Sequence, residues 1–299
     1  MKKKILIVGG TGFIGYHVAK RSKSKNWDVT IISQKKPKIL RKIKNVKYLK
    51  CDISKKKQVT KTLERKNFHY IVNLGGYVDH SNKRKTYLSH YNGCKNLADH
   101  FSKKAIRSFI QIGSGGEYGN LKSPHYETSK CNPKSIYSKA KYLSTKYLIK
   151  LYKKKKFPCT IFRLYQVYGP KQDLNRFISI TVSNCLKNKK FPSSEGKQFR
   201  DFTYINDVVD AIFKAFENAG AKGEVFNIGT GKPLRIKDTI KNIQKACKGG
   251  LPMFGKIQLR KEENIKTYPN IEKAKKIIKW KPKISFLKGI IYTIKSYEK

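Results

Sequence analysis

The sequence predicts an α/β protein with a Rossmann-type doubly wound parallel sheet and a smaller C-terminal substrate-binding region. Two observations support this fold class. A glycine-rich turn from Gly9 to Gly15 lies between an apolar run and a helical pattern near the N-terminus. Short apolar runs then alternate with helical spacing through the first half of the chain, as in βαβ units. A length of 299 residues suits one large domain or two unequal ones.

The strands of the predicted sheet follow one another along the chain. Residues 5–8 form a nearly continuous apolar run, which indicates a strand buried on both faces. The other strands of the first half are expected at residues 29–32, 48–51, 70–74, 109–112 and 160–164. The pattern predicts two further strands, at residues 199–204 and 225–228.

Helices are expected between these strands. Residues 12–21 start a helix directly after the glycine turn, and residues 207–217 form another. The longest helix runs from Tyr137 to about residue 153, with a stripe of apolar side chains at every fourth position. The residues of that stripe are Leu143, Tyr147 and Leu151. Pro158 prevents the helix from continuing.

These elements divide the chain into two regions. Residues 1–165 are the predicted dinucleotide-binding domain, to which a segment at about 203–236 returns. Residues 166–202 and 237–299 are the predicted substrate-binding region, because the pattern becomes less regular past residue 170.

The formal net charge of +49 raises the question of a nucleic-acid partner. Lysine supplies most of this charge, in short runs such as residues 2–4, 55–57 and 153–156 that are spread along the chain. A nucleic-acid groove would more often gather charge on one face and interleave arginine with aromatic side chains. We therefore interpret the charge as a solvated surface and expect no nucleic-acid partner. A nucleic-acid binder on the same fold is the less favoured alternative.

Membrane and metal sites are not expected either. No apolar run approaches the roughly 20 residues that a membrane-spanning helix needs. The six cysteines are scattered, with neither a Cys-x-x-Cys pair nor zinc-ligand spacing. We expect free thiols in a reducing cytoplasm and no metal ion.

The glycine turn has the chemistry of a phosphate cradle for a dinucleotide. Gly9 permits the tight turn, Gly12 lets the backbone approach the pyrophosphate, and Gly15 lets helix and strand pack closely. The N-terminus of the following helix offers its N–H groups and its dipole to the phosphates. The predicted cofactor contacts in this turn are Gly9, Thr11, Gly12, Phe13, Ile14 and Gly15.

The residues that end the second strand favour NADP over NAD. A carboxylate there would hold the ribose 2′-hydroxyl and repel a 2′-phosphate. The chain has Ser-Gln-Lys-Lys at residues 33–36 instead, and we expect Ser33 and Lys35 to contact the cofactor. Asp52, after the third strand, suits either a contact to the adenine or a turn cap before Ser54, and both interpretations stay open.

Three residues predict acid–base chemistry. Tyr137 and Lys141 lie one helical turn apart on the same face. A phenol has a pKa near ~10, and a nearby ammonium stabilises its anion, so the pair can exchange a proton near neutral pH. Ser114 follows the fifth predicted strand at the carboxyl edge of the sheet, where ligands bind in such folds. Its hydroxyl can donate to a substrate oxygen.

With these motifs the chain resembles the extended short-chain dehydrogenase/reductases, specifically the nucleotide-sugar epimerase/dehydratase/reductase group. The resemblance covers essentially the whole length. It rests on an ordered series of motifs: residues 9–15, 51–53, 73–76, 114–119, Tyr137 with Lys141, 163–170, 198–202, Asp207 with Val208, 226–229, Arg260 and 280–282.

The resemblance implies a role for each matching residue. Ser114, Tyr137 and Lys141 match the catalytic triad, and Lys141 also holds the nicotinamide ribose. The further cofactor contacts that it implies are Ile53, Leu74, Gly75, Gly76 and Val167. The substrate contacts that it implies are Ser114, Gln166 near the sugar, Arg200 and Arg260 at the diphosphate, and Glu263 near the nucleotide ribose. A guanidinium suits the diphosphate because it can donate two parallel hydrogen bonds.

Departures from the family pattern narrow the expected reaction. The dehydratases of this group carry an Asp-Glu pair directly after the catalytic hydroxyl, where this chain has Gly115 and Gly116. Elimination of water therefore lacks its acid and base. His90 stands where the family often has Asn, and the pair Gly75 and Gly76 is commonly Ala-Ala.

The expected function is an NADP(H)-dependent reductase of a nucleotide-linked 4-keto-6-deoxy sugar, with hydride delivered to C4 and Tyr137 as the proton donor. The alternative is an NAD-dependent nucleotide-sugar 4-epimerase, which uses the same residues. The resemblance also implies a homodimer that pairs through the helices from about Asn92 and from Tyr137, unless the apolar stripe of the second helix faces the sheet instead.

Overall fold

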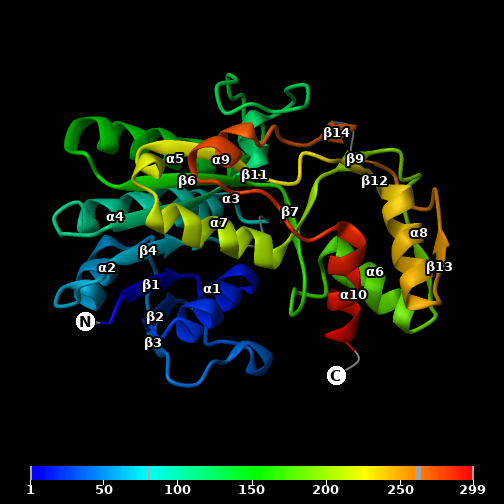
Figure 1. The fold of residues 1–299 in the computed structure, drawn as a ribbon, viewed down its shortest axis with the longest axis horizontal. Helices are drawn as coiled ribbons and strands as arrows, with labels where there is room; N and C mark the ends of the chain where they lie inside the picture. The colour runs from blue at the N-terminus through cyan, green and yellow to red at the C-terminus, as the bar shows by residue number, and fades with distance from the viewer. Residues whose placement is uncertain (1, 78, 80, 260–263, 298–299) are drawn as a thin grey trace.

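A computed structural model describes residues 2–77, 79, 81–259 and 264–297, and its centre is a seven-stranded parallel sheet (Figure 1). The strand order is β11-β6-β5-β4-β1-β2-β3. The chain winds outward from β1 to β3 and then resumes on the other side of β1 with β4, so a switch point lies between β1 and β4. The strands are β1 Lys4–Val8, β2 Asp28–Ser33, β3 Lys47–Lys50, β4 Tyr70–Asn73, β5 Ser108–Ser114, β6 Cys159–Leu164 and β11 Glu224–Ile228.

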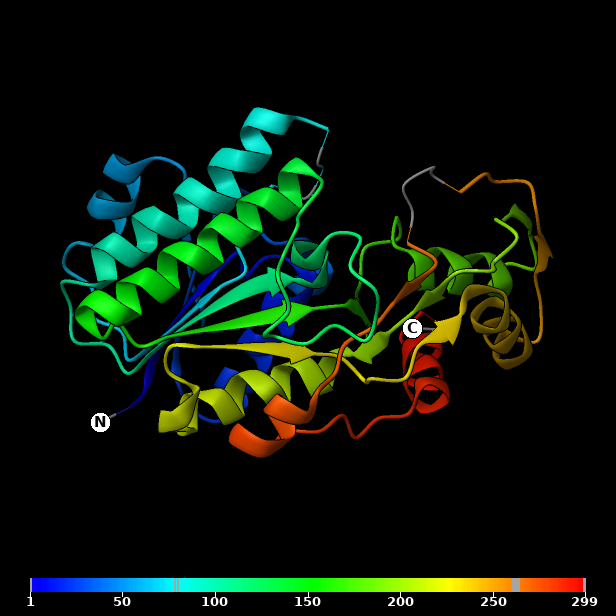
Figure 2. The same cartoon turned by 90° about the horizontal axis from the view of Figure 1, so that it is seen from above.

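Helices cover both faces of this sheet and give three layers (Figure 2). Successive residues of β1 alternate between the faces: Leu6 and Val8 pack with the helices α2, α4 and α5, while Ile5 and Ile7 pack with α1 and α7. The helices of the two layers are α1 Phe13–Ser24, α2 Lys56–Leu63, α4 Gly93–Phe101, α5 Ile136–Lys155 and α7 Ile205–Glu217, with the short α9 Glu272–Ile277 beside β11.

The remaining elements gather at one end of the molecule (Figures 1 and 2). They form small sheets, in which β7 pairs with β10, β8 pairs with β13, and β9 lies between β12 and β14. The strands are β7 Gln166–Tyr168, β8 Lys190–Pro192, β9 Phe199–Arg200, β10 Phe202–Tyr204, β12 Leu234–Arg235, β13 Leu251–Met253 and β14 Lys266–Thr267. The helices of this end are α6 Phe177–Leu186, α8 Ile236–Cys247 and α10 Phe286–Lys295.

The predicted fold class is confirmed by the parallel sheet and its helical layers. The strand expected at residues 199–204 is instead two strands, interrupted at Asp201. The chain changes sheets at this point, because β9 pairs with β12 and β14 while β10 pairs with β7, and the buried Asp201 carboxylate accepts hydrogen bonds from the N–H groups of Thr230 and Gly231 at 2.7–3.0 Å. The domain boundaries stay a prediction.

The helix before α4 has a feature that periodicity did not indicate. α3, Lys83–Tyr87, continues into α4 through a π-helical turn at Leu88–Asn92. α5 lies beside α4, and the fully buried positions on α5 are small or polar residues and Leu148. The predicted stripe of Leu143, Tyr147 and Leu151 is half-buried, and the Tyr147 hydroxyl bonds Asp99 of α4. The homodimer stays a prediction. No helix in the described part of the chain is long and apolar enough to cross a membrane.

Candidate active site

The turn between β1 and α1 is compact because its glycines carry no side chains. Gly9 has a φ of +73°, which glycine adopts readily, and its carbonyl accepts a 3.0 Å hydrogen bond from the N–H of Gly12. A Cβ on Gly15 would lie 2.5 Å from the Cα of Gly10, so only glycine lets the helix approach the turn this closely.

Gly12 leaves open space at the same turn. A Cβ there would meet only the Gly9 carbonyl oxygen, at 3.3 Å. The first N–H groups of an α-helix have no acceptor within the helix, and α1 begins at the next residue. The cradle therefore suits the pyrophosphate of a dinucleotide. The half-buried side chains of Thr11, Phe13 and Ile14 surround it.

The end of β2 lies next to the cradle. The hydroxyl oxygens of Thr11 and Ser33 are 2.9 Å apart, and Lys35 is exposed two residues later. The Asp52 carboxylate accepts hydrogen bonds from the N–H and hydroxyl of Ser54, at 3.0 and 2.7 Å. The turn cap at Asp52 is therefore present, and its contact with an adenine stays a prediction.

The segment after β4 passes the other side of the cradle. A Cβ on Gly9 would lie 3.0 Å from the Leu74 carbonyl oxygen, and one on Gly75 would lie 2.7 Å from the Ile53 side chain. The structure thus brings Ile53, Leu74, Gly75 and Gly76 together beside the glycine turn. Val167, in β7, is half-buried against the main core.

Ser114, Tyr137 and Lys141 meet at the carboxyl end of β5. Ser114 is the last residue of β5, and its hydroxyl lies close enough to the Tyr137 phenol to oppose the rise that burial causes in the pKa of that phenol. Lys141 donates a 2.6 Å hydrogen bond to the Ile112 carbonyl, and its Nζ lies 5.8 Å from the centroid of the Tyr137 ring. The hydroxyl of Ser135 caps α5, so the helix begins just before Tyr137. The geometry is that of a phenol held between a hydroxyl and an ammonium.

Burial shifts the titration of both basic and acidic groups here. Desolvation lowers the pKa of Lys141 to about 8, although the Glu117 carboxylate acts in the opposite direction. Burial raises the pKa of Tyr137, and the nearby hydroxyl of Ser114 opposes that rise. The phenol therefore carries its proton near neutral pH and can serve as an acid.

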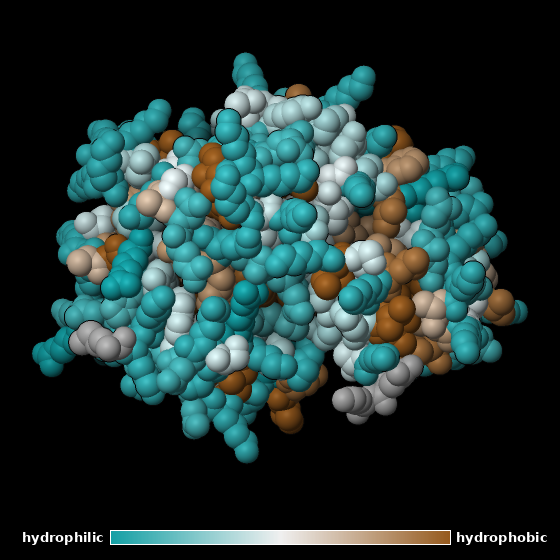
Figure 3. Space-filling model, in the orientation of Figure 1, coloured by the Kyte–Doolittle hydropathy of each residue, from teal (hydrophilic) through white to brown (hydrophobic). Residues whose placement is uncertain are grey.

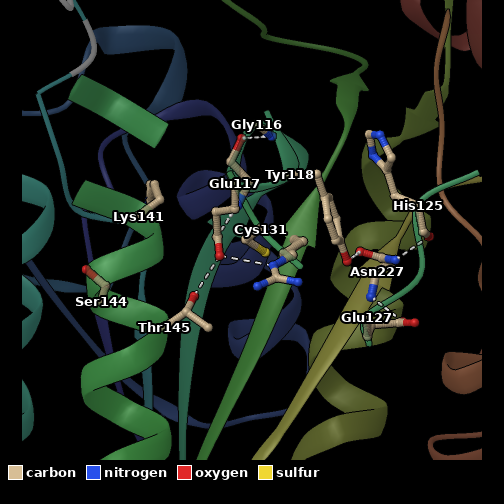
Figure 4. A network of polar contacts seen from close by, with 12 residues as sticks. Gly116, Glu117, Tyr118, His125, Glu127, Cys131, Lys141, Ser144, Thr145 and Asn227 are labelled. Carbon is tan, nitrogen blue, oxygen red and sulfur yellow. Dashed lines mark hydrogen bonds and ion pairs between the residues drawn. The ribbon is translucent and has the colours of Figure 1, made fainter. Parts of the chain in front are cut away.

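A buried carboxylate lies behind these residues (Figure 4). Glu117 has no exposed surface, and it accepts hydrogen bonds from the N–H of Ser114 at 3.0 Å and the hydroxyl of Thr145 at 2.9 Å. Arg163 donates from Nε to the same carboxylate at 3.0 Å. Glu117 therefore joins the carboxyl ends of β5 and β6 to the middle of α5, beside Ser114.

Glu117 falls within the sequence motif at residues 114–119, but the sequence pattern did not indicate a role for it. The available signal was Arg163 inside the apolar strand β6, because a buried guanidinium needs a carboxylate beside it. Gly113 is a second signal, since a Cβ at that position would lie 2.5 Å from the Glu117 carboxylate.

Each of the two glycines after Ser114 lies close to a neighbouring side chain, with Gly115 buried and Gly116 exposed. A Cβ on Gly115 would lie 2.9 Å from the ring of Tyr165, and one on Gly116 would lie 2.8 Å from the hydroxyl of Ser138. The Tyr165 hydroxyl is in turn 2.9 Å from Nδ1 of His125. A side chain at position 115 would therefore collide with the aromatic ring of Tyr165.

A cavity of about 490 Å³ opens among the small sheets. Its lining includes Gln166, Phe177, Asn184, Ser193, Gln198 and Arg200. Tyr165, whose ring lies beside Gly115, directly precedes Gln166 in the chain. The predicted substrate residues Gln166 and Arg200 share this lining. Sequence reasoning missed Asn184 and Ser193, because they belong to the irregular region that carries no motif.

Arg200 is held by the chain on the far side of the cavity. Its Nη1 donates to the carbonyls of Phe199 and Asn264, at 2.8 and 2.9 Å. The predicted substrate contacts Arg260 and Glu263 lie outside the described residues. Their predicted roles therefore stay predictions.

Comparisons with known proteins place this geometry in a family. The chain is 30% identical over 302 residues to a Methanocaldococcus jannaschii protein named as a proposed UDP-glucose 4-epimerase, with 96% of this chain and 95% of that protein covered. It is 26% identical to the dTDP-D-glucose 4,6-dehydratase of Mus musculus, with 99% and 89% covered. The UDP-glucose 4-epimerase of Thermotoga maritima, solved with UDP-glucose, superposes with a TM-score of 0.93 at 25% identity, over 99% and 98% of the two chains.

The family model of the NAD-dependent epimerases and dehydratases matches residues 5–229. That range runs from β1 to the end of β11 and contains the glycine cradle together with Ser114, Tyr137 and Lys141. The chain therefore belongs to the NAD dependent epimerase/dehydratase family of enzymes.

Proposed function

We propose that this enzyme is an NADP(H)-dependent reductase of a nucleotide-linked 4-keto-6-deoxy sugar. The observation that carries the proposal is that Ser114 and Tyr137 lie together beside Lys141 at the carboxyl end of β5. This arrangement supplies one proton and a hydroxyl that can orient a carbonyl. With Gly115 and Gly116 it has no acid–base pair for the elimination of water. A reductase with this site would therefore receive its 4-keto group from a second enzyme.

The residues divide the work between binding and proton transfer. When bound, the nicotinamide cofactor supplies the hydride. Ser114 donates a hydrogen bond to the C4 carbonyl oxygen, and Tyr137 gives that oxygen its proton. Lys141 stabilises the phenolate that remains, because its ammonium lies on the same side of α5. Burial of the site strengthens both interactions.

The cavity would hold the nucleotide end of the substrate. Arg200 and Gln166 both line it. A guanidinium is suited to a diphosphate by its planar set of donors. The NADP preference is supported by Ser33 and Lys35, because no carboxylate ends β2 to repel a 2′-phosphate.

An NAD-dependent 4-epimerase is the second candidate. It is favoured by the similarity to the Thermotoga maritima UDP-glucose 4-epimerase and by the NAD-dependent family. An epimerase would use the same hydroxyl, phenol and ammonium to oxidise C4 and then reduce it from the opposite face. The site residues are common to both reactions, so cofactor use distinguishes them.

The test is to titrate the protein with NADPH and NADH by tryptophan fluorescence, and then to follow their oxidation with a panel of 4-keto-6-deoxy nucleotide sugars. A reductase oxidises NADPH stoichiometrically, and Tyr137→Phe abolishes the reaction while cofactor binding is kept. Ser33→Asp tests the cofactor preference, because the new carboxylate would repel a 2′-phosphate and shift the preference toward NADH.

Two results would replace the first candidate. Tight retention of NAD with interconversion of C4 epimers and no net oxidation establishes the epimerase. Loss of a 6-hydroxyl as water from a hexose nucleotide would contradict both candidates, because Gly115 and Gly116 offer no acid or base for it.

A further inference from the structure

His90 lies where two segments of the site meet. It stands in the π-helical turn Leu88–Asn92, and such turns insert an extra residue in a helix and are frequent at functional sites. Its side chain is 6% exposed. Its backbone carbonyl accepts a 3.0 Å hydrogen bond from the hydroxyl of Ser144 on α5. The turn is therefore attached to the helix that carries Tyr137 and Lys141.

Gly76 provides the space that the His90 ring occupies. A Cβ on Gly76 would lie 2.7 Å from Nε2 of His90 and closer still to Cε1 and Nδ1. Nε2 also lies 3.3 Å from the carbonyl oxygen of Tyr77. The imidazole is therefore packed on the backbone that follows β4, at Gly76, the last of the three consecutive predicted cofactor contacts Leu74, Gly75 and Gly76.

The same imidazole packs against the proton donor. The ring centroids of His90 and Tyr137 are 5.0 Å apart, and their planes meet at 81°. This edge-to-face arrangement is one that aromatic rings prefer. One buried side chain thus contacts both the cofactor segment and the phenol that acts on the substrate.

We propose that His90 is a positioning residue that fixes the place of the Tyr137 ring relative to the backbone at residues 76–77. We also propose that Gly76 and His90 form a matched pair, in which the side chain at one position limits the size of the side chain at the other. The imidazole fills the volume that a Cβ at position 76 would need, so a larger residue at 76 requires a smaller one at 90. His90 acts through Tyr137 and the backbone at 76–77, and it takes no proton in the reaction. The proposal rests on the proposed role of Tyr137 as the proton donor.

The test is a double-mutant cycle with Gly76→Ala, His90→Ala and the two combined. His100→Ala is the matched control, because His100 lies further along α4 and packs edge-on against Phe101, with centroids 5.0 Å apart and planes at 87°. Each protein is measured for thermal unfolding, for the Kd of NADPH and NADH by tryptophan fluorescence, and for kcat and KM with whichever sugar nucleotide the parent protein converts.

The cofactor measurements test the pair. Gly76→Ala alone should weaken cofactor binding at least about tenfold, or prevent folding, because its Cβ collides with the imidazole. The combined variant should return to within about threefold of the parent Kd, since the imidazole is gone. If the combined variant is no better than Gly76→Ala, the matched pair is wrong. This result needs no sugar substrate, so it is decided even if the proposed reduction fails.

The kinetic measurements test the positioning of Tyr137. His90→Ala should lower kcat about tenfold and leave the KM of the sugar nucleotide within about twofold, because the phenol and not the sugar pocket is disturbed. The combined variant should recover cofactor binding and keep the low kcat. An unchanged kcat in His90→Ala, or an equal loss in His100→Ala, would overturn the positioning role.

Discussion

Glu117 and Lys141 are buried ionisable side chains of one site, and the groups that face each of them decide its charge. Glu117 faces Arg163, Thr145 and the N–H of Ser114, so its charge is matched by a cation and two further donors. Lys141 donates to a neutral carbonyl, and burial therefore lowers its pKa. Glu117 therefore holds the segments of the site together, and Lys141 influences proton transfer there.

Replacing Glu117 by glutamine should destabilise the fold and slow the reaction. Glutamine keeps the shape but leaves the Arg163 guanidinium buried without a counter-charge, which costs about 3 kcal/mol of unfolding free energy. The N–H of Ser114 also loses its charged acceptor, so kcat should fall while KM changes little. Denaturant unfolding and steady-state kinetics measure the two effects.

Glu127→Gln is the matched control for that variant. Glu127 lies in the same region (Figure 4) and accepts a 2.8 Å hydrogen bond from the N–H of Asn227. We expect this variant to lose about 1 kcal/mol or less of unfolding free energy, because the neutral glutamine oxygen can still accept the hydrogen bond from Asn227. Equal losses in the two variants would mean that the ion pair of Glu117 carries no special weight.

Turnover should fall as the pH rises through about 8. Lys141 has its pKa lowered to about 8, so its ammonium is present below that pH and is lost above it. Without this charge the phenolate of Tyr137 is no longer stabilised. A profile of kcat from about pH 6 to about pH 10 shows the fall. Lys141→Arg keeps its charge throughout this range and should remove the fall, at a lower kcat. A fall that persists in the arginine variant would assign it to another group.

Among the elements, those with a strict pattern were predictable from sequence. β1 is buried on both faces and reads as one apolar run, and α5 follows the spacing around Tyr137 and Lys141. The glycine cradle was predictable because positions 9 and 15 both favour glycine: position 9 has a positive φ, and a Cβ at position 15 would collide with the backbone of Gly10. These signals are local, so a single sequence reveals them.

Other elements depend on contacts between distant segments. The π-helical turn at Leu88–Asn92 has no periodicity of its own, and it forms where His90 packs on Gly76 and Ser144 binds its carbonyl. The two-residue strand β9 exists because β12 and β14 pair with it on either side. Asn184 and Ser193 reach the cavity only through this assembly. No pattern in the sequence could indicate such contacts.

The cradle predicts opposite behaviour for two of its glycines. Gly15→Ala should destabilise the protein, because its Cβ would lie 2.5 Å from the backbone of Gly10. Gly12→Ala should destabilise the protein far less, since its Cβ meets only the Gly9 carbonyl oxygen at 3.3 Å, a tight contact that a small shift relieves, yet it should weaken the cofactor Kd at least about tenfold by filling the space above α1. Calorimetry and fluorescence titration separate the two effects. Normal cofactor binding by a folded Gly12→Ala protein would place the pyrophosphate elsewhere.

At the scale of the whole molecule, charge is the dominant property. The chain has 68 lysine and arginine residues against 19 acidic ones. Figure 3 shows hydrophilic side chains over most of the face in view, with apolar groups confined to smaller areas. The net charge of +49 produces a broad positive field, toward which a dianionic substrate would be drawn.

This field predicts that salt acts on substrate capture and leaves the chemical step unchanged. Raising the salt from ~50 mM to ~500 mM shortens the Debye length to a few ångströms, so KM for the nucleotide sugar should rise several-fold while kcat stays constant. Arg200→Gln separates the field from the local contact: its KM should be higher at every salt concentration, with the same dependence on salt.

Binding to a random DNA duplex should disappear over the same range, because it rests on counterion release alone. A KM independent of salt, or DNA binding that survives ~500 mM salt with a sequence preference, would contradict the interpretation of the charge as a solvated surface and favour the nucleic-acid alternative.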